Sequence, residues 1–275
     1  MADSSSEFFN LAEVALNDQA QHWGNLGYWQ YDHHYSDACR QLAIELGQYA
    51  RLEKGQTIFD AGFGCGDQIL VWYKGFDVRH VVGVNLSVSQ TKTAARKLQA
   101  MGYLQQSDIQ QGDIHRIERP QKAGQFDRVV ALDCIYHFPD KSLFFLQAHE
   151  LLAAQGILAF TDLVVNVDAK KRWRYSAVRL MCKLSRIPAA NMKDMQQLRQ
   201  GLEDQGYHKI EHQDISAQVM EGFAQWYFGP YRPDRNKLTL AQHLKYKITA
   251  RFLRWSHHND LLSYRLIRAE KCAKR

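Results

Sequence analysis

Three glycines at alternate positions, following a short apolar run, mark a ligand-binding loop early in the chain. Gly62, Gly64 and Gly66 stand in the stretch FDAGFGCG at 59–66. Glycine lets the backbone turn sharply and approach a ligand closely, and the N-terminus of the following helix offers unpaired N–H groups. A dinucleotide-binding loop would carry its third glycine one residue later. Asp60, just before the loop, suits a cationic ammonium group, directly or through water, rather than a phosphate.

The stretch from Asp60 to Gly66 resembles motif I of the class I S-adenosylmethionine-dependent methyltransferases, and the similarity extends over most of 23–162. In that family the second strand normally ends in an acidic residue that holds the ribose. Here Asn85 takes that place, followed by Leu86 and Gln90. This variant is similar to a small-molecule subgroup that includes sugar and natural-product O-methyltransferases, tocopherol methyltransferases and cyclopropane fatty-acid synthases. The resemblance implies S-adenosylmethionine as cofactor and a ribose contact for Asn85 and Gln90, with Leu86 in the same cofactor-binding set.

The resemblance also assigns four further cofactor contacts. Asp113 and Ile114, after the third strand, would bind the adenine, and Leu132 would supply backbone at the sulfonium end. Tyr28 would close over the methionine part. The alternatives are a solvated Gln90, an N-capping Asp113 and a Tyr28 that merely packs in the core.

The candidate catalytic residues follow the fourth and fifth strands. His137 comes after a strand end on the crevice side, and an ordinary imidazole pKa of ~6.5 suits a general base. Asp162, on the neighbouring strand, could orient His137 and stabilise its imidazolium. Related sugar-modifying O-methyltransferases carry a histidine and an aspartate at these two places, but have two adjacent histidines where this chain has Tyr136 and His137. Tyr136 could hydrogen-bond the acceptor. A buried structural role for His137 is the alternative.

The elements that must position these residues alternate between strand and helix patterns, which predicts a doubly wound α/β sheet of seven mostly parallel strands. We expect one domain over 1–275, with an N-terminal helical cap over 1–50 and inserted lid segments at 168–200 and 222–258. Expected strands lie at 57–61, 80–85, around 109, at 126–132, from 156, at 207–214 and at 261–268. Expected helices lie at 68–74, 89–101 and 141–153, and within 7–49.

The two inserted segments are aromatic and basic. In a helix, Trp173, Ala177, Leu180, Met181 and Leu184 fall on one stripe, with the basic residues largely elsewhere. Such a helix could roof an apolar pocket or lie on an anionic membrane surface, and packing against the sheet or a solvated face is the plain alternative. Together with the aromatic run 226–228, the stripe favours a small, largely apolar or aromatic acceptor.

Composition narrows the remaining functions. The 275 residues carry a net charge of +6, and no apolar run reaches the ~20 residues of a membrane span. Five dispersed cysteines without a C-x-x-C pair argue against a zinc site and, with no signal-like N-terminus, predict a cytoplasmic protein with no metal.

Because the fourth strand lacks an Asn/Asp-Pro-Pro-Tyr/Phe loop, we expect no nucleic-acid substrate. O-methylation is the favoured reaction. N- or C-methylation, lipid modification, RNA methylation, a non-catalytic cofactor-binding protein and an oligomer stay open.

Overall fold

A seven-stranded sheet in the order β3-β2-β1-β4-β5-β7-β6 forms the centre of the chain, as expected. The computed structural model describes residues 16–17, 21–30, 34–116, 125–166, 168, 173–231 and 238–272. Only β7 runs antiparallel to its neighbours, and the other strands share one direction. The strands are β1 (Thr57–Ala61), β2 (His80–Asn85), β3 (Ser107–Gln111), β4 (Phe126–Ala131), β5 (Leu152–Val165), β6 (Tyr207–Asp214) and β7 (Leu262–Lys271).

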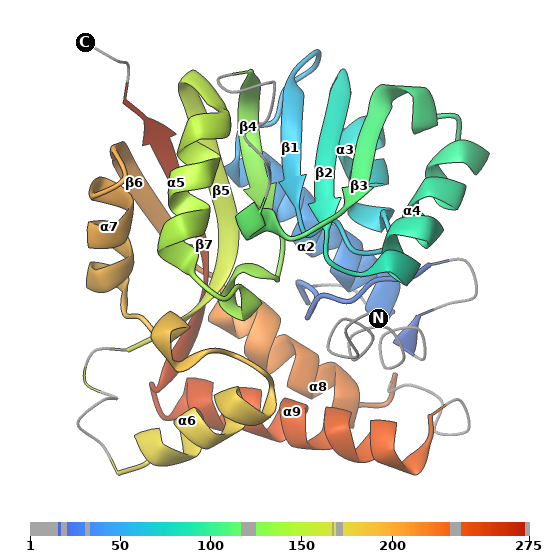
Figure 1. Cartoon of the computed structure of the whole chain (residues 1–275). Coiled ribbons are helices and arrows are strands. Elements are labelled where there is room, and N and C mark those ends of the chain that lie inside the picture. Colours follow the sequence, from blue (N-terminus) through green and yellow to red (C-terminus); the bar gives the residue numbers. More distant parts are fainter. Residues whose placement is uncertain are drawn as a thin grey trace.

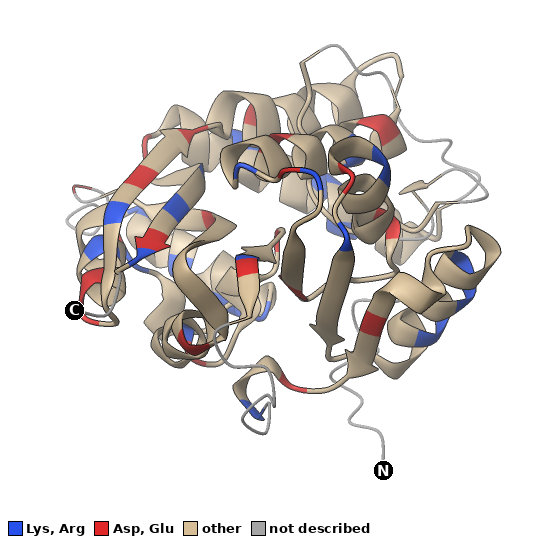
Figure 2. Cartoon of the chain, turned by 90° about the horizontal axis from the view of Figure 1, so that it is seen from above, with Lys and Arg blue, Asp and Glu red and all other residues tan. Residues whose placement is uncertain are grey.

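Helices cover both faces of this sheet (Figures 1 and 2). On one face, one apolar cluster joins side chains of α2 (Tyr35–Tyr49), α3 (Asp67–Phe76) and α4 (Val88–Ala100), among them Leu42 and Trp72. On the other face, a second cluster joins α5 (Lys141–Leu151) and α7 (Met195–Glu203). The doubly wound α/β architecture is thereby confirmed.

Local capping explains where several of these helices begin. The Asp140 carboxylate accepts hydrogen bonds from the second and third N–H groups of α5, at 2.8 and 3.1 Å, and Asp194 forms a capping box with Gln197 at the start of α7. A helix that begins on a fixed residue directs the preceding loop, so these caps fix the loops at the carboxyl ends of β4 and β5.

A helical layer lies beyond the carboxyl ends of the parallel strands (Figure 1). It contains α6 (Tyr175–Leu184), the π-helical turn η8 (Ala217–Glu221), α8 (Gly222–Phe228) and α9 (Leu240–His258). The expected segment 168–200 therefore divides: α6 lies in this layer, whereas α7 packs on the sheet beside α5 through Leu198 and Leu202. Of the helices expected within 7–49, α2 is present and packs on one face of the sheet, and the helix expected from residue 7 lies outside the described residues. In the described part of the chain, no helix is long and apolar enough to cross a membrane.

Candidate active site

A cavity of about 380 Å³ opens at the carboxyl ends of β1, β2 and β4, where the sequence motifs converge. This is where ligands bind in doubly wound sheets. Ten of the predicted site residues line it: Gly62, Gly64, Asn85, Leu86, Gln90, Asp113, Ile114, Leu132, Tyr136 and His137. Tyr28, Asp60, Gly66 and Asp162 do not line the cavity.

The glycine loop approaches the cavity through backbone that only glycine adopts easily. Gly62, Gly64 and Gly66 have φ angles of +81°, +57° and +86°. A Cβ on Gly64 would have nothing within 4 Å, so the cavity is open there, whereas a Cβ on Gly62 would lie 2.9 Å from the Sγ atom of Cys134. Gly66 instead lets α3 pack against α4, because its Cβ would lie 2.9 Å from that of Ala94. Gly66 is therefore a packing residue.

We expect Gly62→Ala to weaken S-adenosylmethionine binding at least tenfold, because the new methyl group crowds Cys134 and left-handed backbone costs a non-glycine residue ~1–2 kcal/mol. Gly55→Ala is the matched control, since Gly55 has a φ of +82° with nothing near its Cβ. Isothermal titration calorimetry compares the two. Equal affinities for both variants would contradict this role of the loop.

Asp60 precedes the glycine loop in the chain, and its side chain does not line the cavity. Its carboxylate is fully buried and accepts hydrogen bonds from Gln68 Nε2 and Trp72 Nε1, both at 2.7 Å. Burial raises the pKa of Asp60 to about 6, against the opposing effect of these two donors. The carboxylate therefore ties β1 to α3, and the expectation of direct contact with an ammonium group is corrected, whereas contact through water stays a prediction.

The polar residues predicted to contact the ribose and the adenine line the cavity. Asn85 Nδ2 donates to Gln90 Oε1 at 3.0 Å, so the two amides form one unit, able to donate to and accept from a vicinal diol. Asp113 accepts from the backbone N–H of His115 at 2.9 Å, and the His115 ring lies 2.8 Å from the carbonyl of Asp140. His115, to which the sequence analysis assigned no role, therefore links Asp113 to the start of α5.

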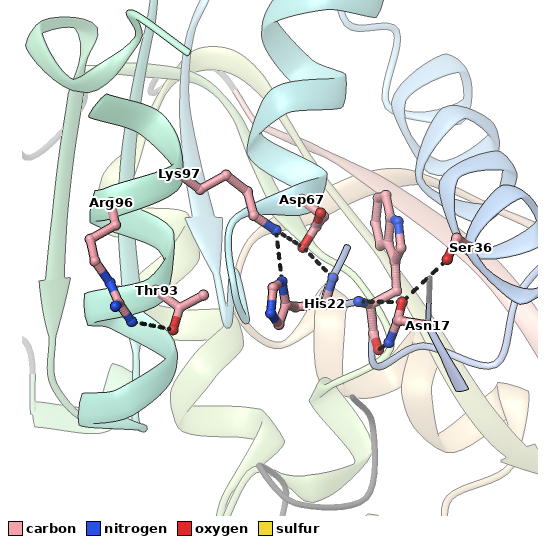
Figure 3. A network of polar contacts seen from close by, with 8 residues as sticks. Asn17, His22, Ser36, Asp67, Thr93, Arg96 and Lys97 are labelled. Carbon is pink, nitrogen blue, oxygen red and sulfur yellow. Dashed lines mark hydrogen bonds and ion pairs between the residues drawn. The ribbon is translucent and has the colours of Figure 1, made fainter. Parts of the chain in front are cut away.

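An N-terminal segment closes one side of the cavity, but through residues other than Tyr28. His22, Trp23, Gly24 and Asn25 line the cavity, while Tyr28 is buried behind them. Polar contacts fix this segment: the backbone N–H of His22 donates to Asp67 Oδ2 at 3.2 Å, and Lys97 binds the same carboxylate (Figure 3). The tyrosine expected over the methionine part is thus a core residue, and the segment that precedes it contacts the ligand space.

His137 and Tyr136 lie on the 3-10 turn η5 (Ile135–His137) that follows β4. Burial lowers the pKa of His137 to about 4, and a hydrogen bond to the backbone of Arg186 acts in the opposite direction. His137 is therefore neutral at physiological pH. The Tyr136 hydroxyl donates to Asp133 Oδ1 at 2.7 Å, and burial raises its pKa well above the ordinary value. Tyr136 is thus a neutral donor already engaged by a carboxylate.

Asp162 does not orient His137. Both its oxygens accept hydrogen bonds from Lys141 Nζ, at 2.8 and 2.6 Å, and both side chains are fully buried. Lys141 also donates to the backbone carbonyl of Asn191 at 3.0 Å. The Nδ2 atom of Asn191 donates to the carbonyls of Tyr136 and Phe138, at 3.1 and 2.5 Å. Asp162 therefore acts on the His137 turn only indirectly, by fixing Lys141 and Asn191.

Like His115, Asp133 was not predicted from the sequence as a site residue. It stands two residues after the end of β4, is half-buried at the cavity, and has a φ of +53°. Besides Tyr136, it accepts from Tyr264 and from the backbone N–H of Leu26, the latter at 2.9 Å. It thus joins the N-terminal segment, the His137 turn and β7. An acidic residue at the carboxyl end of a central strand was the signal that could have identified it.

The aromatic run of the second inserted segment packs against the N-terminal segment, outside the cavity. Trp226 stacks on Trp29 and Tyr35 with ring centroids 4.7 and 5.6 Å apart, and the Tyr227 hydroxyl lies 2.8 Å from a ring nitrogen of His243. None of residues 226–228 lines the cavity. Among the described residues of 168–200 and 222–258, only Arg186 lines it, so the apolar acceptor wall expected there is not found.

Several known proteins resemble this chain. Erythromycin 3''-O-methyltransferase of Saccharopolyspora erythraea is 25% identical over 224 residues, covering 79% of this chain and 72% of that protein. Geranyl diphosphate C-methyltransferase of Streptomyces coelicolor A3(2), solved with S-adenosylhomocysteine, superposes with a TM-score of 0.76 at 15% identity over 98% of this chain and 97% of that one. The [4+2]-cyclase SpnF shares the fold with a TM-score of 0.72, at 18% identity over 100% of this chain and 97% of that one.

The fold, the glycine loop and the relatives define a class I S-adenosylmethionine-dependent methyltransferase of the small-molecule branch. The chain belongs to the mycolic acid cyclopropane synthetase family, whose sequence pattern matches residues 3–257. The cavity suits its cofactor, because an open glycine loop, the Asn85–Gln90 amides and Asp113 all line it.

Proposed function

We propose that the enzyme methylates a hydroxyl group of a small, largely apolar molecule, with His137 as general base. The observation that carries the proposal is that a neutral imidazole lines the same cavity as Leu132, the residue that we assign to the sulfonium end. The apolar side chains of Phe138 and Pro139 also line this cavity, and the Asp133 carboxylate is engaged by Tyr136 and Tyr264.

Bound S-adenosylmethionine supplies a methyl group on a positively charged sulfur. The cavity must hold the acceptor oxygen in line with that carbon and sulfur, and alignment alone supplies ~7–11 kcal/mol in favourable cases. The oxygen lone pair forms the new C–O bond while the C–S bond breaks and leaves its electron pair on sulfur. As the oxygen becomes positively charged its proton turns strongly acidic, so even an imidazole with a pKa of about 4 accepts it.

Methylation of nitrogen or carbon is the second candidate, and the low basicity of His137 favours it. An acceptor amine attacks as the free base, and a carbon acceptor places positive charge on the substrate, so neither reaction needs a strong base at the start. Lipid modification belongs to the same candidate. An RNA methyltransferase and a non-catalytic cofactor-binding protein rank lower, since no feature of the cavity favours them.

The test is product analysis after incubation with methyl-labelled S-adenosylmethionine and three matched acceptor sets: apolar alcohols, apolar amines and isoprenoid diphosphates. NMR identifies the methylated atom. O-methyl products, formed preferentially from apolar alcohols, support the proposal. Products methylated only at nitrogen or carbon would overturn the O-methyl assignment, and cofactor binding without any product would favour a non-catalytic protein.

The buried state of His137 predicts an unusual pH dependence. Because its pKa is about 4, we expect kcat to stay level from pH 8 to about pH 5, whereas a solvated imidazole would lose its base form near ~6.5. In the folded state the pKa lies below its unfolded value. The residue's contribution to stability is therefore complete above about pH 6.5 and is lost as the pH falls toward 4. A kcat profile that falls with an apparent pKa near 6.5 in the wild type would contradict this.

None of the five cysteines forms a disulfide, and the described residues hold no cluster of three metal-binding side chains. The cytoplasmic location, the absence of a metal or nucleic-acid partner and the oligomeric state stay predictions, as does the division of 1–275 into core, cap and lids.

A further inference from the structure

Helices α6 and α9 expose apolar side chains that nothing in the described structure covers. The buried side of α6 is formed by Val178 and Cys182, so the stripe that the sequence singled out faces outward. Trp173, just before α6, is 82% exposed, and Leu180 and Leu184 are 58% and 64% exposed. The plain alternative of a stripe packed against the sheet is therefore wrong for these three residues.

Helix α9 repeats the arrangement. Its buried side carries Tyr246, Ala250 and Leu253, while Leu240, Leu244 and Ile248 recur every four residues on the opposite side, with exposures of 85%, 55% and 43%. A guanidinium N–H of Arg174 donates to Asn259, which joins the start of α6 to the end of α9. Figure 1 shows both helices in the layer beyond the carboxyl ends of the strands. We call these six exposed side chains the outer apolar face.

The charged side chains that α6 and α9 themselves carry are all basic, and of these Arg254 pairs with Glu221 of the turn η8. Neither α6 nor α9 contains an aspartate or glutamate, and together they contain six lysines and arginines. Arg179 and Lys183 lie on α6, and Arg251 lies on α9 near Ile248; all three are exposed. Exposed leucine and tryptophan beside cations, without acids, is the composition of helices that lie in the interface of an anionic bilayer. A surface that binds nucleic acid would also carry cations, but it would not need exposed leucines.

We propose that this protein docks on anionic membranes through the outer apolar face, with the cations of α6 and α9 on the lipid headgroups. The docking places the bilayer next to the cavity, because the chain that leaves α6 reaches Arg186, which lines it. If the proposed function holds, the acceptor is a lipid-soluble molecule that enters from the bilayer. The docking itself does not depend on that function.

The test is flotation of the full chain, without cofactor or acceptor, with vesicles of phosphatidylcholine alone or with about one third phosphatidylglycerol. We expect binding to the anionic vesicles only, weakened as salt is raised above ~0.1 M, where the Debye length falls below ~10 Å. Leu180→Glu and Leu244→Glu should each weaken partitioning at least tenfold. Reversing Arg179 and Lys183 should weaken it by about fivefold or more per residue.

The matched control is Leu146→Glu on α5, another exposed leucine (41%) but on the face of the sheet. It should bind vesicles like the wild type, and all variants should melt at the wild-type temperature because the replaced side chains are exposed. Equal binding of neutral and anionic vesicles, no binding to either, or wild-type binding by Leu180→Glu and Leu244→Glu would overturn the proposal. Sedimentation that shows a dimer disrupted by the same two variants would overturn it too, since the face would then join two copies. Because vesicle binding is measured without turnover, its failure leaves the methyl-transfer proposal standing.

Discussion

Replacement of His137 by alanine is expected to lower kcat by ~10²–10⁴, the usual contribution of a general base, with little change in the affinity for S-adenosylmethionine. The imidazole lines the cavity at the place where we propose that the acceptor binds, whereas the cofactor contacts are proposed for other residues. Single-turnover kinetics with a methylated acceptor, together with calorimetric titration of the cofactor, measure the two quantities separately.

Two controls make this prediction specific. His137→Gln keeps a polar side chain of similar size but cannot accept the proton as an imidazole does, so it should be as slow as His137→Ala. Tyr136→Phe removes the hydroxyl bonded to Asp133 without removing the base, and should retain most of the rate. If His137→Ala turns over within a few-fold of the wild type, base-assisted O-methylation is wrong and the N- or C-methylation candidate gains.

Asp162→Ala is expected to destabilise the fold by ~3–5 kcal/mol, because it leaves the ammonium group of Lys141 buried without its carboxylate. Urea unfolding followed by circular dichroism measures the loss. The backbone of Asn191 would also lose its fixed donor, and with it the support of the two carbonyls that flank His137. We therefore expect a lower kcat in this variant even at temperatures where it stays folded.

The double variant Lys141→Met, Asp162→Leu should recover most of that stability, since a well-packed apolar pair can replace a buried ion pair. Asp108→Ala, at an exposed carboxylate 3.1 Å from His80, should cost less than ~1 kcal/mol. The opposite outcome is that Asp162→Ala loses no more stability than Asp108→Ala and still loses most of its kcat. That result would favour the sequence-based prediction that Asp162 orients His137.

The sheet was predictable because its signals are local. The ranges 57–61, 80–85 and 207–214 were expected as strands and are β1, β2 and β6 to the residue. The fifth strand departs most from the expectation: it begins not at residue 156 but at Leu152, where the sequence LAAQ favours a helix. Pairing of Leu152 with Phe126 of β4 overrides that propensity.

Most of the residues predicted to bind the cofactor do line the cavity, since they belong to the glycine loop or follow a strand end within a few positions. The acceptor side was not. Asp162 and Lys141 are 21 residues apart on different elements, and sequence spacing does not show which of two nearby groups a buried carboxylate will bind. Arg186 reaches the cavity from the end of α6, a position fixed only by how that helix packs. Tyr28 and Asp60 were predicted to contact the cofactor but are buried away from the cavity. Tertiary packing decides which side of a short segment faces the ligand, and the sequence does not show it.

The most direct test of the whole account is a thermal-shift titration with S-adenosylmethionine, S-adenosylhomocysteine and NADH, run in parallel on the wild type and Gly62→Ala. A ligand at about a hundred times its dissociation constant adds ~2.7 kcal/mol of stability, which raises Tm by about 5 °C or more for a chain of this size. We expect both adenosyl sulfur compounds to raise the Tm of the wild type, a smaller rise in Gly62→Ala, and no effect of NADH. A rise with NADH alone, or with none of the three, would contradict the assignment of the glycine loop and every site residue that depends on it.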